Sequence, residues 1–192
     1  FSYDEYCEKV ENSFAEVGHH IRGIHTFQDP VKAIEHAEAI VVGGGNTWQL
    51  VRKMHDNKLM NPVREKVFNQ TPYIGWSAGS NVACPSLKTT NDMPIVEPQS
   101  FESLNLVPFQ INPHYLDKNP EGHGGETRQQ RIEEFLIANQ QTTVVGLREG
   151  TILRVEGDKM SLLGERDARV FKYGEEFYEL TNKDDFSFLL KL

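Results

Sequence analysis

Short apolar runs alternate with longer amphipathic stretches through the first 150 residues of this chain. Residues 39–42 and 73–75 are two such runs, and each is followed by a glycine-rich turn and then by residues at helical spacing. Strands buried on both faces are short and apolar throughout, so this alternation is typical of parallel strands joined by crossover helices. It predicts an α/β fold, with a mostly parallel open sheet and helices on both faces.

Turn residues and apolar spacing place the remaining elements of this region. Asp29 and Pro30 predict the start of one helix, and a second is expected from near Asn46. Further helices are expected after Phe1 and from about Pro62, where apolar residues recur at helical spacing. Additional strands are predicted at residues 21–24, 107–111 and 143–147. The large apolar side chains expected in the core include Tyr3, Phe14, Trp48 and Phe68.

Beyond Gly150 the pattern changes to short alternating strands, which predict antiparallel hairpins beside the main sheet. These strands are expected at residues 151–155, 159–163, 168–173 and 177–180. No internal repeat or low-complexity linker divides the chain, and 192 residues are enough for one sizeable core. We therefore expect a single domain over residues 1–192.

The charge balance limits the classes of partner. The chain has 28 acidic and 20 basic residues, for a formal charge of -8, and no long Lys/Arg cluster, so we expect no nucleic-acid partner. The sequence contains no run of about 18 apolar residues, so it predicts no membrane span. Cys7 and Cys84 are too few for a disulfide framework or a cysteine-rich zinc site, and the histidines lack zinc spacing, so no metal is expected. A small-molecule or peptide substrate fits this composition best.

Residues 75–79 (GWSAG) place glycines two residues on either side of Ser77, directly after an apolar run. This is the pattern of a nucleophile elbow, a sharp strand-to-helix turn that exposes a serine hydroxyl beside a base. An ordinary glycine-rich turn is the alternative.

Serine chemistry needs a base and a third group that orients it. His114 follows the predicted strand 107–111, so a parallel strand would deliver it to the same sheet edge as Ser77. Glu149 follows the strand 143–147 in the same way and is the candidate third member. The alternatives are a structural or surface histidine and a solvated loop glutamate.

Backbone N–H groups at a glycine-rich turn can stabilise the oxyanion of an acyl-transfer reaction. Residues 43–46 (GGGN) and Ala78 are candidates for this role. Nucleotide binding is the alternative for the glycines, but no Gly-Lys-Ser/Thr follows them, and Trp48 stands where the dinucleotide fingerprint needs its third glycine.

Five motifs in consistent spacing then identify a family. The order Ser77, His114, Glu149 differs from that of the α/β-hydrolases. In this order of residues and in the five motifs, the chain resembles the peptidase E family of α-aspartyl dipeptidases. That family is related to cyanophycinase and, by fold, to class I glutamine amidotransferases. The motifs are residues 41–47 (VVGGGNT), 73–79 (YIGWSAG), 89–94 (TTNDMP), 110–114 (QINPH) and 125–128 (GETR).

The resemblance implies a cytoplasmic serine peptidase that cleaves Asp-X dipeptides with a free amino terminus and uses no metal or organic cofactor. It implies that Ser77 is the nucleophile, His114 the general base and Glu149 the residue that orients it. The other implied site residues are Gly45 and Ala78 in the oxyanion hole and Asp92 and Arg128 in substrate recognition. Family members also begin with a strand ahead of the helix at Phe1, so the sheet is expected to lack that strand.

Several alternatives stay open at this stage. Asp92 could hold the ammonium group of the substrate or brace the loop around His114, and Arg128 could be a solvated arginine at a helix start. A cyanophycinase-like hydrolase of β-aspartyl-arginine and a non-catalytic module that binds an acidic ligand are the rival functions. A homodimer through the C-terminal hairpins is a further hypothesis from the sequence.

Overall fold

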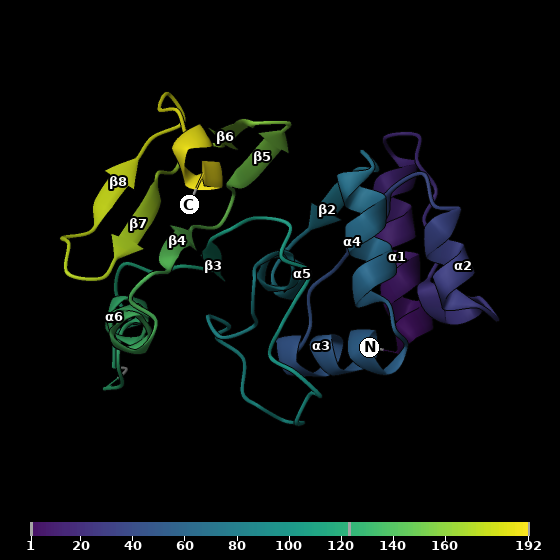
Figure 1. The fold of residues 1–192 in the computed structure, drawn as a ribbon, viewed down its shortest axis with the longest axis horizontal. Helices are drawn as coiled ribbons and strands as arrows, with labels where there is room; N and C mark the ends of the chain where they lie inside the picture. Colours follow the sequence, from purple (N-terminus) through teal and green to yellow (C-terminus); the bar gives the residue numbers. More distant parts are fainter. Residues whose placement is uncertain (1, 123, 192) are drawn as a thin grey trace.

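The computed structural model describes residues 2–122 and 124–191, and Figure 1 shows helices and strands alternating in its first half. These elements are α1 (Tyr3–Ala15), η1 (Ile24–Thr26), α2 (Pro30–Glu35), β1 (Ile40–Val42), α3 (Thr47–Asp56), α4 (Met60–Phe68), β2 (Tyr73–Gly75) and α5 (Ala78–Ala83). The second half contains β3 (Gln110–Pro113), α6 (Arg128–Ala138), β4 (Thr143–Leu147), β5 (Ile152–Glu156), β6 (Lys159–Leu163), β7 (Ala168–Lys172), β8 (Tyr178–Leu180) and η2 (Ser187–Lys191). No helix in the described ranges is long and apolar enough to cross a membrane.

Polar caps begin the helices where the sequence predicts them. The Asp29 side chain accepts a hydrogen bond from the backbone of Lys32 at the start of α2, where Pro30 occupies the first turn. The Asn46 side chain accepts one from the Gln49 N–H at the start of α3. Each cap satisfies a backbone donor that has no partner within its helix, and the Asn46 cap fixes the point where the glycine-rich turn becomes α3.

The strands form three hydrogen-bonded sheets. β1 and β2 make a parallel pair, β3-β4-β7-β8 make a mixed sheet, and β5 and β6 make a hairpin. Pairing is parallel between β3 and β4 and antiparallel from β4 to β7 and from β7 to β8. The α/β class and the C-terminal hairpins are therefore confirmed. Among the described residues, however, no hydrogen-bonded ladder joins the β1–β2 pair to β3, so the expected single open sheet is not formed.

Two strand predictions need correction. Residues 21–24 do not form a strand: the chain there leads into η1, because the N–H and the hydroxyl of Thr26 both donate to the Gly23 carbonyl and close a turn. The strand expected at 107–111 is observed as β3, at Gln110–Pro113. Pro108 precedes this strand and Pro113 is its last residue, and each lacks a backbone donor for a sheet.

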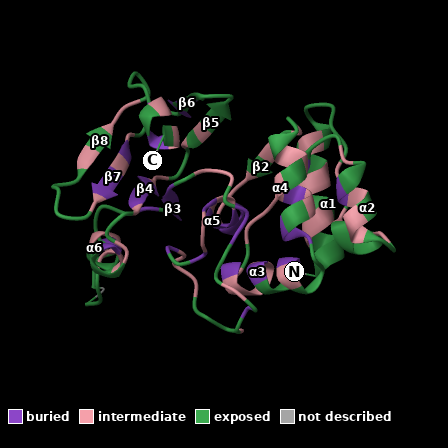
Figure 2. Cartoon of the chain, viewed as in Figure 1, coloured by how far each residue is buried: buried purple, intermediate pink, exposed green. Residues whose placement is uncertain are grey.

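Figure 1 shows α1 to α4 with β2 on one side of the molecule, β3 to β8 with α6 on the other, and α5 between them. α5 is the most buried helix, as its colour in Figure 2 shows, and its Ala78, Gly79, Asn81 and Val82 are all buried. The Asn81 amide donates to the carbonyl of Ile111 at 2.9 Å, which anchors α5 to β3. The elbow helix therefore connects the two halves.

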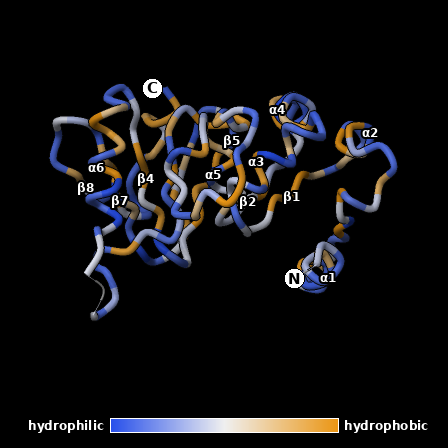
Figure 3. Tube along the Cα trace, turned by 90° about the horizontal axis from the view of Figure 1, so that it is seen from below, coloured by the Kyte–Doolittle hydropathy of each residue, from blue (hydrophilic) through white to orange (hydrophobic). Residues whose placement is uncertain are grey.

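The helix α1 forms as predicted, but none of its residues is buried. Figure 3 shows α1 and α2 at the end of the molecule opposite β8. Two of the expected core residues are in fact exposed, Tyr3 by 62% and Phe68 by 63%. The core cluster of this half includes residues of α2, β1, α3 and α4 together with Val82 of α5, and neither Tyr3 nor Phe68 belongs to it.

Candidate active site

Ser77 lies on a sharp turn between β2 and α5. Its backbone has φ 55° and ψ -115°, a conformation that non-glycine residues rarely adopt and that is common at functional sites. The two flanking glycines allow this turn because the backbones meet closely. A Cβ on Gly79 would lie 2.8 Å from the carbonyl carbon of Val42, and one on Gly75 would lie 2.7 Å from the Gly79 carbonyl oxygen. The predicted strand-to-helix turn is confirmed.

The glycine-rich loop after β1 lies against this serine. A Cβ on Gly44 would lie 3.2 Å from the Cβ of Ser77, so the two loops are in contact. The Gly44 N–H donates to the hydroxyl of Tyr6 at 2.9 Å. Within the described part of the chain, the N–H groups of Gly45 and Ala78 donate no hydrogen bond. They are therefore free to act as oxyanion donors.

His114 and Glu149 follow the neighbouring parallel strands β3 and β4. The carboxylate of Glu149 is hydrogen-bonded to Nδ1 of His114. Their side chains are 49% and 63% exposed, so solvent and substrate can reach them. This pairing leaves Nε2 of the imidazole for a proton from a nucleophile, as in a serine triad.

Ser77 and His114 both lie in the part of the chain that the structure describes, and there their side chains form no hydrogen bond with each other. In proteins without substrate, catalytic hydrogen bonds are often long or poorly aligned, and they tighten only in the substrate complex.

Asn91 and Asp92 connect the two parts of the site. The Asp92 carboxylate accepts hydrogen bonds from the N–H and the hydroxyl of Thr47, both at 2.7 Å, at the start of α3. The Asn91 amide donates to the carbonyl of Pro113 at 2.8 Å, directly before His114. The observed contact with the segment before His114 is therefore made by Asn91, and the observed contact of the Asp92 carboxylate is with Thr47.

Arg128 is the first residue of α6 and is half-buried. Burial and then the neighbouring Arg131 lower the pKa of its guanidinium, while Asp92 acts in the opposite direction. Arg128 makes no ion pair or hydrogen bond with any residue that the structure describes. A half-buried cation near Asp92 and without a paired anion is suited to receive an acidic group from a ligand.

Sequence reasoning missed the contributions of Tyr6 and Asn91. Asn91 lies inside the motif at residues 89–94, next to Asp92, and this position could have indicated a role in the site. Tyr6 carries no such signal, because in the sequence it is one more apolar position of α1.

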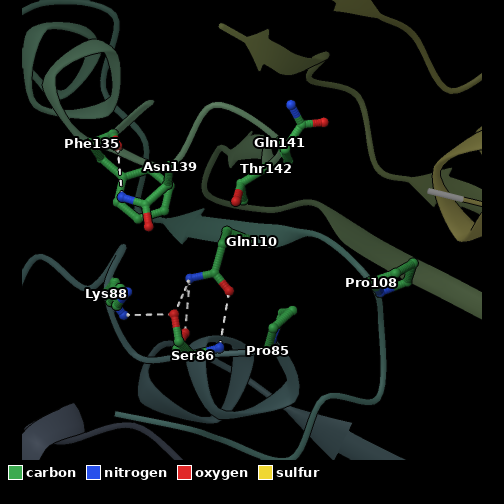
Figure 4. Close-up of a pocket in the computed structure, with 9 residues that line it drawn as sticks. All are labelled: Pro85, Ser86, Lys88, Pro108, Gln110, Phe135, Asn139, Gln141 and Thr142. Atoms are coloured by element: carbon green, nitrogen blue, oxygen red, sulfur yellow. Dashed lines mark hydrogen bonds between the residues drawn. The ribbon is translucent and has the colours of Figure 1, made fainter. Parts of the chain in front are cut away.

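Other candidate groups lie outside this neighbourhood. Cys84 is buried, and burial raises the pKa of its thiol to about 12, against a smaller opposing effect of a hydrogen bond from Ile111. A hollow of about 220 Å³ lies beside Gln110, at the end of β3 opposite His114. Figure 4 shows the residues that line it. The Gln110 amide there is hydrogen-bonded to Ser86. In the described part of the chain, no three His, Cys, Asp or Glu side chains group as a metal site requires.

A serine on a strained strand-to-helix turn, a His–carboxylate pair and free backbone donors are the features of a serine-type hydrolase. The comparisons with known proteins agree. The chain matches the model of peptidase family S51 over residues 1–163 and therefore belongs to that family, which makes it a serine-type peptidase. The resemblance found in the sequence is confirmed.

The similar proteins give the same result. "Peptidase E" of Nostoc sp. is 52% identical over 190 residues, covering 99% of this chain and 78% of the relative. "Peptidase E" of Salmonella paratyphi A is 49% identical, covering 91% of this chain and 76% of the relative. The crystal structure of a peptidase from an acI-B1 Actinobacterium is similar in fold, with a TM-score of 0.64 at 16% identity over 96% of this chain and 76% of that one.

Proposed function

We propose that this chain is a dipeptidase that hydrolyses α-aspartyl dipeptides, Asp-X with a free amino terminus, through an acyl-enzyme on Ser77. The support is of two kinds. The resemblance and the relatives named Peptidase E carry the reaction class. The half-buried Arg128, without an ion-pair partner among the described residues, is the observation that carries the acidic specificity.

In the first step, the hydroxyl oxygen of Ser77 attacks the aspartyl carbonyl carbon while Nε2 of His114 accepts the hydroxyl proton. Glu149 keeps the imidazole oriented through Nδ1. The N–H groups of Gly45 and Ala78 stabilise the oxyanion. Collapse of the tetrahedral intermediate breaks the C–N bond, and His114 donates its proton to the leaving amine.

In the second step, water takes the place of the leaving amine. His114 accepts a proton from this water, whose oxygen attacks the acyl carbon, and the Ser77 oxygen leaves as the acyl bond breaks. The proton returns to Ser77, so free aspartate is released and the enzyme is restored.

Arg128 can bind the side-chain carboxylate of the substrate with two parallel charge-assisted hydrogen bonds. The free oxygen of the Asp92 carboxylate is available for the substrate ammonium group, since only Oδ2 accepts from Thr47. A substrate with asparagine instead would leave the Arg128 charge unmatched. Such a mismatch costs on the order of 2 to 4 kcal/mol.

The test measures release of free aspartate or other amino-terminal residues from α-Asp-X, Asn-X, Glu-X and β-Asp-Arg substrates. We expect cleavage of α-Asp-X alone, and its loss in Ser77→Ala. Cleavage by Ser77→Ala at the wild-type rate would overturn the mechanism. Preference for β-Asp-Arg would indicate the cyanophycinase-like function, and binding without turnover would indicate the non-catalytic module.

The specificity test uses two arginines one turn apart on α6. Arg128→Met is expected to reduce the preference for Asp over Asn by roughly 30- to 700-fold. Arg131→Met is the matched control, because Arg131 is exposed and pairs with Glu126 at 3.7 Å. An unchanged preference in Arg128→Met would remove Arg128 from substrate recognition.

A class I glutamine amidotransferase-like fold is supported by the two parallel strand pairs and by the serine turn after β2. A cytoplasmic location and a homodimer are hypotheses from the sequence, and cell fractionation and light scattering test them.

A further inference from the structure

Four charged side chains, here called the arginine cluster, meet next to the His114–Glu149 pair. They are Asp117, Arg148, Arg169 and Glu179. Arg148 donates to both oxygens of Asp117, at 2.6 and 3.1 Å, and to both oxygens of Glu179, at 2.8 and 2.9 Å. Arg169 contacts Glu179 at 2.6 Å and Asp117 at 3.0 Å. Two cations therefore face two anions in forked geometry, which is the strongest form of ion pairing in proteins.

The strand register brings these residues to one edge of the mixed sheet. Arg169 pairs with Gly146 across β4 and β7 and with Glu179 across β7 and β8. Arg148 directly follows β4, and Asp117 lies four residues after the end of β3. Figure 1 shows β3, β4, β7 and β8 side by side, so the cluster ties the segments after two parallel strands to two antiparallel ones.

Tyr115 connects the arginine cluster to the backbone at His114. Its N–H donates to the Leu147 carbonyl at 3.1 Å, and its hydroxyl accepts from Arg169 at 3.1 Å. Its ring lies 5.5 Å from the guanidinium carbons of both Arg148 and Arg169. A Cβ on Gly146 would lie 2.8 Å from this ring, so the ring rests directly on the β4 backbone.

The arginines are well shielded, whereas the catalytic candidates are not. The side chains of Arg148 and Arg169 are 12% and 14% exposed, against 49% for His114 and 63% for Glu149. Packing alone therefore does not fix the His114–Glu149 pair. Each member instead adjoins a residue that the cluster holds, since Tyr115 follows His114 and Arg148 precedes Glu149.

We propose that the arginine cluster, and Arg148 above all, is a positioning device that keeps the Glu149 carboxylate on Nδ1 of His114. Arg148 acts through the backbone of its neighbours and touches no substrate. This inference rests on the proposed function in so far as the pair is catalytic, but the geometry that it concerns exists without substrate.

The main test is Arg148→Lys, which keeps the charge and removes the forked hydrogen bonds. We expect kcat for α-Asp-X to fall by about 10- to 100-fold, the range associated with a displacement on the order of 1 Å, while KM stays within about twofold. In substrate-free Arg148→Lys, we expect the NMR resonance of the His114 Nδ1 proton, which the Glu149 carboxylate accepts in wild type, to shift upfield or disappear.

Arg154→Lys is the matched control, because Arg154 forms an exposed ion pair with Glu156 on the hairpin. It is expected to leave kcat and the proton resonance unchanged. Asp117→Asn is the second variant, since it keeps both hydrogen bonds from Arg148 to Glu179 and is expected to fold even if Arg148→Lys does not. We expect it to lower kcat in the same direction.

Folded variants that lose thermal stability but keep the wild-type kcat and proton resonance would overturn the positioning role and leave only a structural one. Failure of the proposed function gives a different result. In that case, wild type shows no Ser77-dependent cleavage, and the proton resonance still reports whether Arg148→Lys releases Glu149 from His114.

Discussion

The contact between the elbow and β1 makes Gly79→Ala the most informative single substitution. A Cβ on Gly79 would lie 2.8 Å from the carbonyl carbon of Val42, closer still to its oxygen and 3.3 Å from its Cβ, whereas ordinary contacts of a Cβ begin at 3.4 Å. The nearest atoms belong to the backbone of a strand and cannot rotate away. Either α5 or β1 must therefore shift by more than a few tenths of an ångström.

Forcing an extra methyl group into such a contact typically costs 1–3 kcal/mol, and a rigid backbone favours the upper end, about 3 kcal/mol. For a chain of this size, that corresponds to a fall in Tm of roughly 6–12 °C. Because Ser77 directly precedes α5, a shift of the helix also moves its hydroxyl, and kcat is expected to fall by about 100-fold.

The assay is thermal unfolding together with steady-state kinetics, and Gly124→Ala is the control because a Cβ there meets no atom within 4 Å. Gly124→Ala is expected to stay within about 0.5 kcal/mol of wild type. Equal Tm and kcat values in the two variants would refute the conclusion that the close approach of α5 and β1 makes glycine necessary.

Three further predictions follow from individual contacts. Tyr6→Phe removes the hydroxyl that accepts from the Gly44 N–H, so kcat should fall about tenfold in steady-state assays, whereas Tyr3→Phe, on the same helix but exposed, should not change it. Cys84 should resist iodoacetamide at pH 8 in folded protein and react in urea, since burial raises its pKa to about 12; equal labelling in both states, measured by mass spectrometry, would contradict this. Hydrogen bonding within the arginine cluster, chiefly with Arg148, lowers the pKa of the Asp117 carboxyl group below its value in the unfolded chain. Its contribution to stability is therefore present at pH 7 and lost as the pH falls below about 4, so the difference in urea midpoint between wild type and Asp117→Asn should be larger at pH 7 than at pH 3.

Local signals in the sequence predicted the part of the fold that local chemistry controls. The caps at Asn46 and Asp29, the turn at Ser77 and the strands before it depend on residues within one or two turns of each other. The same holds for the edge positions of His114 and Glu149, because both follow apolar strands whose direction a parallel sheet determines.

The features that were not predicted depend on partners distant in sequence. The exposure of Tyr3 and Phe68 depends on which distant elements pack against α1 and α4, and no amphipathic pattern reports that. The contact of Tyr6 with Gly44 spans 38 residues, and an apolar stripe does not distinguish a tyrosine that packs from one that accepts a hydrogen bond. The link between Arg148 and Asp117 likewise joins two charges that look solvated in the sequence.

The adjacent residues Asn91 and Asp92 have a consequence for how the chain between α5 and β3 can vary. Asn91 is bound to the segment before His114, and Asp92 is bound to the start of α3, so one peptide unit sets the spacing between His114 and the glycine-rich loop. Beyond it, residues 93–95 are exposed. Insertions and deletions in this region should therefore be tolerated after Met93 and should abolish activity between Asn91 and Asp92, even where the protein still folds.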